Sequence, residues 1–304
     1  MLDLQIKDET SVLEAVVLGT AKDNGQMPSP EEAYDPKSLE FILAGTYPVE
    51  SDMIRELEAF EAVLLKHNVR VFRPEVIPGC NQIFSRDIAF VIDNKMVKAN
   101  ILPDREREFE AIVHVLDQIA PNQLLIPPAE VHIEGGDVMP WDDYLFIGTY
   151  TKPDYADYIT ARTNKEAVDY LTLQFPNRKI KAFELRKSNT DPRRNALHLD
   201  CCFQPVGCNL AILHRESFLD SKDVDWILSY FGASNVFEID TEEMYRMNSN
   251  VFSIAPNIVV SEQSFYRLNS WLRERGITVE EIAFGEVGKQ GGLLRCSTLP
   301  LRRG

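Results

Sequence analysis

The sequence lacks the features that mark several large classes of protein. No run of about 18 apolar residues is present, so no helix is expected to span a membrane. Its 32 basic residues are outnumbered by 47 acidic ones, and the net charge of −15 argues against nucleic acid or an anionic membrane as a partner. Neither a glycine-rich dinucleotide motif nor a P-loop occurs, so no nucleotide cofactor is expected.

Cysteine and histidine are scarce, with five residues of each. The cysteines are odd in number and show no paired Cys-x-x-Cys spacing, which favours a reducing compartment over a disulfide framework. The cysteines and histidines do not have the spacing of zinc ligands, so no metal site is expected. The first nine residues are acidic and lack the apolar stretch of a secretory signal peptide. We therefore expect a cytoplasmic protein that needs no metal and no organic cofactor.

The composition is ordinary for a globular protein, with 44% hydrophobic and 26% charged residues. No low-complexity linker divides the chain, and its length allows a substantial core. We expect residues 1–304 to form a single domain. The oligomeric state stays open, with a homo-oligomer among the alternatives.

A weak structural repeat runs along the chain. Each unit of roughly 40–60 residues reads as a hairpin, an amphipathic helix and a strand. An ordinary α/β protein with incidental internal similarity is the alternative. The expected helices cover residues 51–67, 105–116, 165–173, 224–230 and 263–275, and the strands after them cover residues 69–72, 124–126, 179–183, 236–239 and 278–284.

Five residues with reactive or charged side chains stand out at the unit junctions. Cys296 lies near the end of the chain, although a free cysteine is more often a small buried hydrophobe. His198 and Asp200 are two apart, which would place them on one face of a strand. Glu134 precedes a diglycine, where a backbone can approach a ligand closely, and Asp87 lies at another junction. A thiol, an imidazole and three carboxylates can hold a planar cation and attack its carbon.

In this order and at this spacing, the segments around these residues resemble the guanidino-group-modifying superfamily, also called penteins. Its members include arginine deiminase, dimethylarginine dimethylaminohydrolase and glycine amidinotransferase. The resemblance runs along most of the chain and rests on residues 84–87 (FSRD), 133–137 (IEGGD), 197–200 (LHLD) and 290–298 (QGGLLRCST). It implies a five-bladed α/β propeller of five ββαβ units around a pseudo-fivefold axis, with the active site in the central channel.

The resemblance also implies a role for each of the five residues. Cys296 would attack the guanidinium carbon as a thiolate, and His198 would protonate the leaving amine and then activate water. Asp87 and Asp200 would chelate the terminal nitrogens, and Glu134 would accept a further N–H and help to position His198. The alternative for each is a structural role, as a solvated acid or a core histidine. Asp87 and Asp200 lie inside apolar runs, however, where a charge needs a partner.

Three arginines complete the expected site. Arg105, in an R-x-x-E motif, and Arg162 match family positions that hold the carboxylate of the substrate. The alternative for both is a surface ion pair of little energetic value, and Arg107 could replace Arg105. Arg295 directly precedes the nucleophile and is expected to help hold it as a thiolate. The polar segment 22–34 follows a strand expected at residues 13–20 and is well placed there to act as a lid.

The resemblance also bears on the choice between branches of the superfamily. Glu134 stands where deiminases and hydrolases have Glu and amidinotransferases have Asp, which favours water as the acceptor. Asp200 stands where dimethylarginine hydrolases generally lack a carboxylate, and a methylated substrate would leave this acid unpaired.

We therefore expect a cysteine-dependent hydrolase, a deiminase or dihydrolase, that acts on arginine or a close small guanidino analogue and releases ammonia. An amidinotransferase is the alternative, because residues 86–88 and 198–200 fit that branch too. A non-catalytic binding protein on the same fold is a third interpretation.

Overall fold

The structure is a computed structural model that describes residues 2–304, and it contains five three-stranded sheets. In each sheet the first two strands form an antiparallel pair, and the third strand pairs in parallel with the second. The strands, sheet by sheet, are β15 (Thr298–Arg303), β1 (Leu13–Leu18) and β2 (Arg70–Phe72); β3 (Ala89–Ile92), β4 (Lys95–Lys98) and β5 (Leu124–Leu125); β6 (Val138–Trp141), β7 (Tyr144–Thr149) and β8 (Lys179–Glu184); β9 (Phe203–Val206), β10 (Leu210–Leu213) and β11 (Val236–Glu238); and β12 (Phe252–Ala255), β13 (Ile258–Glu262) and β14 (Thr278–Ile282).

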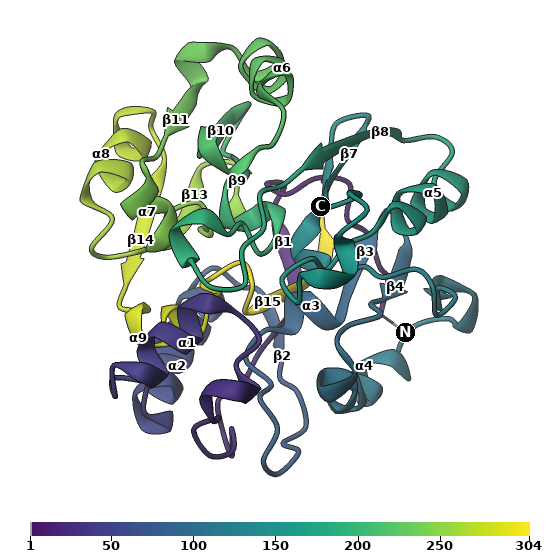
Figure 1. Ribbon diagram of the computed structural model, residues 1–304. Coiled ribbons are helices and arrows are strands. Elements are labelled where there is room, and N and C mark those ends of the chain that lie inside the picture. Colours follow the sequence, from purple (N-terminus) through teal and green to yellow (C-terminus); the bar gives the residue numbers. More distant parts are fainter. Residues whose placement is uncertain (1) are drawn as a thin grey trace.

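Helices connect the second and third strands of each unit and lie on the outside of the molecule (Figure 1). Between residues 2 and 304, none of them is both long enough and apolar enough to cross a membrane. The connecting helices are α2 (Glu50–Lys66), α4 (Val113–Leu116), α5 (Lys165–Gln174), α6 (Ser221–Phe231) and α8 (Tyr266–Glu274), and the remaining ones are α1 (Pro36–Leu43), α3 (Ser85–Ile88), α7 (Thr241–Tyr245) and α9 (Gly285–Gly288).

This architecture is the five-bladed α/β propeller that the sequence predicts, and that prediction is confirmed. The last strand, β15, lies beside β1 near the centre of Figure 1 and pairs with it in antiparallel fashion. The two ends of the chain therefore complete one sheet together and close the ring. The sequence analysis did not identify β15 as a strand.

One expected helix has a different geometry. Residues 105–116 were expected to form a continuous α-helix, but the segment Pro103–Ile112 (η2) is a 3₁₀-helix that continues into α4. Side chains three residues apart are eclipsed in a 3₁₀-helix. This geometry aligns Arg105 with Glu108, and the two form a buried bidentate ion pair.

Three hairpins turn through a residue in the left-handed region of backbone space. Asp93, Asp142 and Asn209 have φ angles of 52°, 46° and 58°, respectively. Asp and Asn tolerate this conformation better than other non-glycine residues, and tight hairpin turns require it. These turns set the register of β3 with β4, β6 with β7 and β9 with β10.

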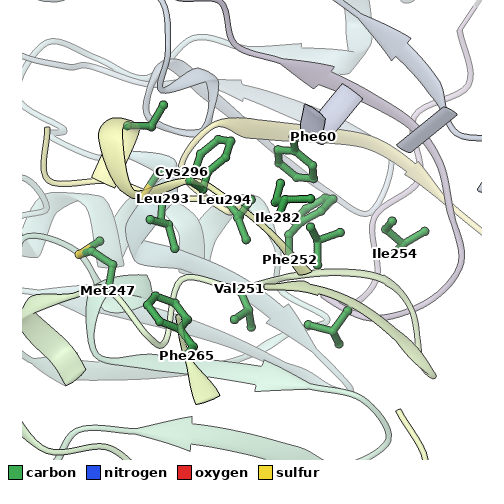
Figure 2. Close-up of a cluster of buried hydrophobic side chains, with 14 of the residues drawn as sticks. Phe60, Met247, Val251, Phe252, Ile254, Phe265, Ile282, Leu293, Leu294 and Cys296 are labelled. Atoms are coloured by element: carbon green, nitrogen blue, oxygen red, sulfur yellow. The ribbon is translucent and has the colours of Figure 1, made fainter. Parts of the chain in front are cut away.

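The largest hydrophobic cluster joins the first unit to the fifth. Phe60 of α2 is fully buried, and its ring meets the rings of Phe252 and Phe284 edge-on, each at a centroid distance of 5.7 Å. Figure 2 shows Cys296 in this cluster, beside Leu293 and Leu294. The end of the chain is therefore held by the same core that closes the ring.

We predict that Phe60→Ala lowers the free energy of unfolding by about 3–5 kcal/mol, because it leaves a cavity where three aromatic rings meet. Urea unfolding followed by circular dichroism measures this loss. The control is Leu65→Ala on the same helix, whose side chain is 57% exposed, and we expect it to change stability by less than about 1 kcal/mol. Equal effects of the two substitutions would contradict the assignment of this core.

Candidate active site

Five of the sequence-predicted site residues lie in turns just before the first strand of their units. Asp87 lies in α3, directly before β3, and Glu134 precedes the 3₁₀ turn Gly135–Asp137 that leads into β6. His198 and Asp200 belong to a similar turn before β9, so they are not on a strand as the sequence suggested. Cys296 lies two residues before β15. These equivalent positions bring residues far apart in the sequence together.

Cys296 is buried, with 3% of its surface exposed, and several polar groups surround its sulfur. The Asn250 amide nitrogen donates a hydrogen bond to Sγ at 3.2 Å, and the thiol lies 3.5 Å from Oδ2 of Asp200. Burial and then the negative charges of Asp200 and Asp87 raise the pKa of the Cys296 thiol well above its usual value. A hydrogen bond with the Leu293 backbone and then the one from Asn250 act in the opposite direction and lower this pKa. Cys296 is therefore a protonated thiol in the free protein at neutral pH.

His198 and Glu134 form a buried pair. Nε2 of His198 lies 2.8 Å from Oε2 of Glu134, and Nδ1 lies 3.8 Å from Oδ1 of Asp87. Burial alone would lower the pKa of His198, but Asp87 and the hydrogen bond with Glu134 outweigh it and raise this pKa to about 9. The second Glu134 oxygen accepts a hydrogen bond from Nη1 of Arg162 at 2.9 Å. Although burial opposes ionisation, Arg162 and His198 hold the pKa of Glu134 well below its usual range.

Close packing between two site segments depends on a glycine. A Cβ atom on Gly136 would lie 2.6 Å from the His198 ring, closer than any side chain allows. The diglycine after Glu134 is therefore needed for the imidazole to lie against this backbone. The sequence analysis expected close approach to a ligand at this point, and here the approaching group is the ring of His198.

Asp87 binds one arginine and has one oxygen without a partner. Its Oδ2 accepts a hydrogen bond from Nη1 of Arg105 at 3.0 Å, while Oδ1 is buried without a hydrogen-bond partner. Burial raises the pKa of Asp87, although His198 and Arg105 oppose the shift. Glu108 accepts two further hydrogen bonds from Arg105, from Nε at 2.7 Å and from Nη2 at 2.9 Å. Burial dominates there as well and raises the pKa of Glu108 to about 7.

The two expected carboxylate-binding arginines both reach the site, and both have internal partners. Arg105 is bound by Asp87 and Glu108, as described above. Arg162 donates to Glu134, to the Ile159 carbonyl at 2.7 Å and to the Tyr34 carbonyl at 3.0 Å. A substrate carboxylate would have to use their remaining N–H groups or displace these partners.

Arg295 does not point toward the sulfur of its neighbour. Its guanidinium, fully buried, binds Glu9 through two bonds of 3.1 Å and Oδ2 of Asp200 through one of 2.8 Å. Burial disfavours the charge on Glu9, but Arg295 outweighs it and lowers the pKa of Glu9 to about 2. Arg295 therefore neutralises two buried acids and reaches Cys296 only through Asp200.

A cavity of about 260 Å³ reaches Cys296. Its walls include Asp87, His198 and Cys296 from the site, together with both Arg105 and Arg162. The segment expected to act as a lid lines the same cavity between Asn24 and Tyr34, where the Tyr34 carbonyl binds Arg162. Asp200 does not line this cavity, and Glu134 lines a neighbouring one together with Arg162. The cavity is of a size that suits a small amino acid.

Three comparisons place the chain among known proteins. A family model described as N,N dimethylarginine dimethylhydrolase, eukaryotic, matches residues 47–303. The chain belongs to this family. Arginine deiminase relatives and amidinotransferase structures place it in the pentein superfamily, as the sequence predicted.

The similar proteins carry several different names. An uncharacterised protein, YkgA, from Bacillus subtilis is 28% identical over 79% of this chain and 77% of its own length. Arginine deiminase from Bacillus cereus is 26% identical over 74% of this chain and 62% of its own length, so this pentein spans about three fifths of that enzyme. Inosamine-phosphate amidinotransferase StrB1 from Streptomyces griseus is 15% identical, with a TM-score of 0.77 over 100% of this chain and 97% of that one, which shows a common fold.

The same cluster of side chains could in principle ligate a metal ion. Donor atoms of Asp87, Glu134 and His198 all lie within 4.8 Å of one another. Both oxygens of Glu134 are engaged, however, and Arg105 and Arg162 border the cluster with positive charge. This environment suits a planar organic cation that donates hydrogen bonds better than a divalent ion.

The sequence analysis missed two residues that the structure places in the site. Asn250 contacts Cys296, and Glu9 holds Arg295. The repeat could have pointed to Asn250. Residues 248–250 precede the hairpin of the fifth unit, and Asp87 precedes the hairpin of the second unit in the same way. Glu9 carried no such signal, since it lies in an irregular segment before β1.

We predict that His198 titrates near pH 9 in an NMR titration and that Glu134→Gln lowers this pKa by about one unit or more, because a charged partner is lost. The folded pKa exceeds the unfolded value of about 6.5, so protonated His198 stabilises the fold below about pH 6.5, and this contribution is lost as the pH rises through 9. Substitution of the exposed Glu110 by Gln serves as the control. An unchanged His198 pKa in Glu134→Gln would contradict the assigned pairing.

Proposed function

We propose that this pentein is a cysteine-dependent hydrolase that acts on the guanidinium group of free arginine or a close analogue. One observation carries the proposal. Oδ1 of Asp87 is buried without a partner, 3.8 Å from Nδ1 of His198, in the cavity that also contains Cys296. A bound guanidinium would donate an N–H to this oxygen and place its carbon near the sulfur.

The charges of the site favour a cationic substrate over a neutral one. Asp87 and Asp200 suppress ionisation of Cys296 in the free protein. A guanidinium between them would offset these negative charges and lower the pKa of the thiol, whose proton would then leave to solvent. The nucleophile would therefore be formed when the substrate is present, which protects the thiol in its absence.

The reaction would proceed through two tetrahedral adducts. The Cys296 thiolate attacks the guanidinium carbon, and protonated His198 donates its proton to an amino group, which leaves as ammonia. The product of this step is a thiouronium in which carbon is bonded to sulfur. Neutral His198 then accepts a proton from water, whose oxygen attacks the same carbon and expels the thiolate. A ureido product and free Cys296 result, and Glu134 keeps the imidazole oriented throughout.

The position of Asp200 favours an unmethylated guanidinium. Its Oδ2 lies 3.5 Å from the sulfur of Cys296 and accepts a hydrogen bond from Arg295 at 2.8 Å, so a guanidinium that reaches this sulfur would share Asp200 with Arg295. A nitrogen carrying two methyl groups would offer no N–H to these acids, and turned toward Asp87 it would leave the buried Oδ1 of that residue without a hydrogen bond. The name of the matching family points to dimethylarginine, so the choice between the two substrates must be tested directly.

Recognition of the amino-acid end would fall to Arg105 and Arg162. Both border the cavity, and each has N–H groups beyond those used in the internal ion pairs. A substrate carboxylate could share these arginines with Asp87, Glu108 and Glu134. Compounds without a carboxylate would then bind less tightly.

We predict that Cys296→Ala abolishes ammonia release from arginine while the protein stays folded, because the thiol supplies a bond to carbon that no other group can form. Cys201→Ala and Cys208→Ala should retain most of the activity. Ammonia is measured by a coupled assay, and folding is checked by thermal unfolding. Turnover by folded Cys296→Ala would overturn the proposed mechanism.

We predict that arginine is turned over faster than asymmetric dimethylarginine or agmatine by at least about tenfold in kcat/KM, because the first analogue lacks N–H donors for the acids and the second lacks a carboxylate for Arg105 and Arg162. The products to be measured are ammonia, dimethylamine, citrulline and ornithine. Faster release of dimethylamine would show that dimethylarginine is the substrate, as the family name indicates, and that the inference from Asp200 is wrong. Formation of guanidinoacetate in the presence of glycine, at the expense of ammonia, would establish an amidinotransferase.

A further inference from the structure

Four of the five units contribute a proposed catalytic or substrate-binding residue from the turn before their first strand, and the fifth unit has an equivalent turn. Residues 248–250 precede β12 as Asp87 precedes β3. All three side chains of this turn are buried, and Asn250 is fully so. The turn faces the nucleophile and not the solvent.

Asn250 contacts Cys296 on two sides. Its Nδ2 donates a hydrogen bond to Sγ at 3.2 Å, and its Oδ1 accepts one from the Cys296 backbone N–H at 3.1 Å. The same Nδ2 lies 3.3 Å from the carbonyl oxygen of Asp200, to which Ser249 also donates a hydrogen bond at 2.8 Å. One turn of the fifth unit therefore holds both the nucleophile and the acid beside it.

We propose that Asn250 is a positioning residue that fixes the orientation of the Cys296 sulfur and stabilises its thiolate by donating a hydrogen bond to it. This inference rests on the proposed function in one respect, namely that Cys296 is the nucleophile. An amide N–H binds a negatively charged sulfur more strongly than a neutral thiol, so the bond favours ionisation.

The other groups around the sulfur make this donor important. Asp200 and Asp87 oppose ionisation of Cys296. The cations nearby are committed elsewhere, because Arg295 binds Glu9 and Asp200, and Arg86 donates to the Arg295 carbonyl and to Thr298. His198 is held by Glu134.

Within residues 2–304, Asn250 supplies the side-chain hydrogen bond that the Cys296 sulfur accepts. An asparagine suits this place because it remains neutral. It can therefore donate to the sulfur without adding a charge that would compete for the carboxylates of the site. Its carbonyl end, at the same time, fixes the backbone of the nucleophile.

The test measures reactivity of the thiol without any substrate. The full-length protein is treated with iodoacetamide, the Cys296 thiolate displaces iodide from the reagent, and mass spectrometry of the Cys296 peptide gives the rate. The variants are Asn250→Ala, which removes both hydrogen bonds, and Asn250→Asp, which keeps an acceptor for the Cys296 N–H but removes the donor. Asn248→Ala is the matched control, because it removes a buried amide from the same turn. Thermal unfolding verifies that each variant is folded.

We expect Asn250→Ala to lower the alkylation rate at about pH 8 roughly tenfold, corresponding to a rise of about one unit in the thiol pKa. Asn250→Asp should lower it further, because a carboxylate repels the thiolate, and Asn248→Ala should leave it near the wild-type value. A wild-type rate in folded Asn250→Ala would overturn the proposal. A wild-type rate in Asn250→Asp would overturn it too, since only the acceptor would then matter.

The same variants distinguish this inference from the proposed function. If the alkylation rates shift as expected but arginine is not turned over by the wild-type protein, Asn250 keeps its role and the proposed reaction is wrong. If arginine is hydrolysed while the alkylation rates stay unchanged in Asn250→Ala, the reaction stands and the role of Asn250 is refuted.

Discussion

The buried contact of Arg295 with Glu9 and Asp200 joins the three parts of the chain on which the rest of the structure depends. Glu9 comes from the segment before β1, Asp200 from the fourth unit, and Arg295 from the turn before β15. Removing one partner would leave an unpaired buried charge at a cost of about 3–5 kcal/mol. The value of such a network lies less in net stability than in fixing one arrangement. Here it fixes where Cys296 lies relative to Asp200.

Electrostatics of the site follow from that arrangement. With Arg295 committed to Glu9 and Asp200, no arginine within residues 2–304 forms a hydrogen bond with the sulfur, and burial and the two nearby carboxylates raise the pKa of the thiol. His198, by contrast, is held as a cation by Asp87 and Glu134. The resting site thus combines a protonated thiol with a protonated imidazole. In the proposed reaction this state changes only when a further cation enters and balances the carboxylates.

Much of the fold could be predicted from the sequence because the repeat shows itself locally. Hairpins, amphipathic helices and strands recur, and the turn at Asp93 and the helix α5 appear close to where the sequence suggested them. β15 could not be found in this way, since its strand character depends on pairing with β1, almost the whole chain away. The 3₁₀ geometry around Arg105 depends likewise on burial of its ion pair with Glu108, which local pattern does not reveal.

The sequence predicted which side chains lie together at the candidate site, but it did not predict which partners each of them binds. Motifs identified Cys296, His198 and Glu134, yet adjacency in sequence misled for Arg295, whose side chain leaves the backbone in a different direction from that of Cys296. Asp200 likewise proved to be bound by Arg295 and to lie behind the cavity wall. Side-chain direction in irregular turns depends on tertiary packing, and the turns that carry these residues contain no regular period from which it could be read.

The most direct test of the central claim, that Cys296 forms a bond to the guanidinium carbon and releases ammonia, is mass spectrometry of the protein quenched during turnover of arginine. The account predicts an adduct on the Cys296 peptide whose mass is that of arginine less ammonia. An adduct that carries only the amidino group, with ornithine released, would contradict ammonia as the leaving group. An adduct on another cysteine, or none while arginine is consumed, would contradict Cys296 as the nucleophile.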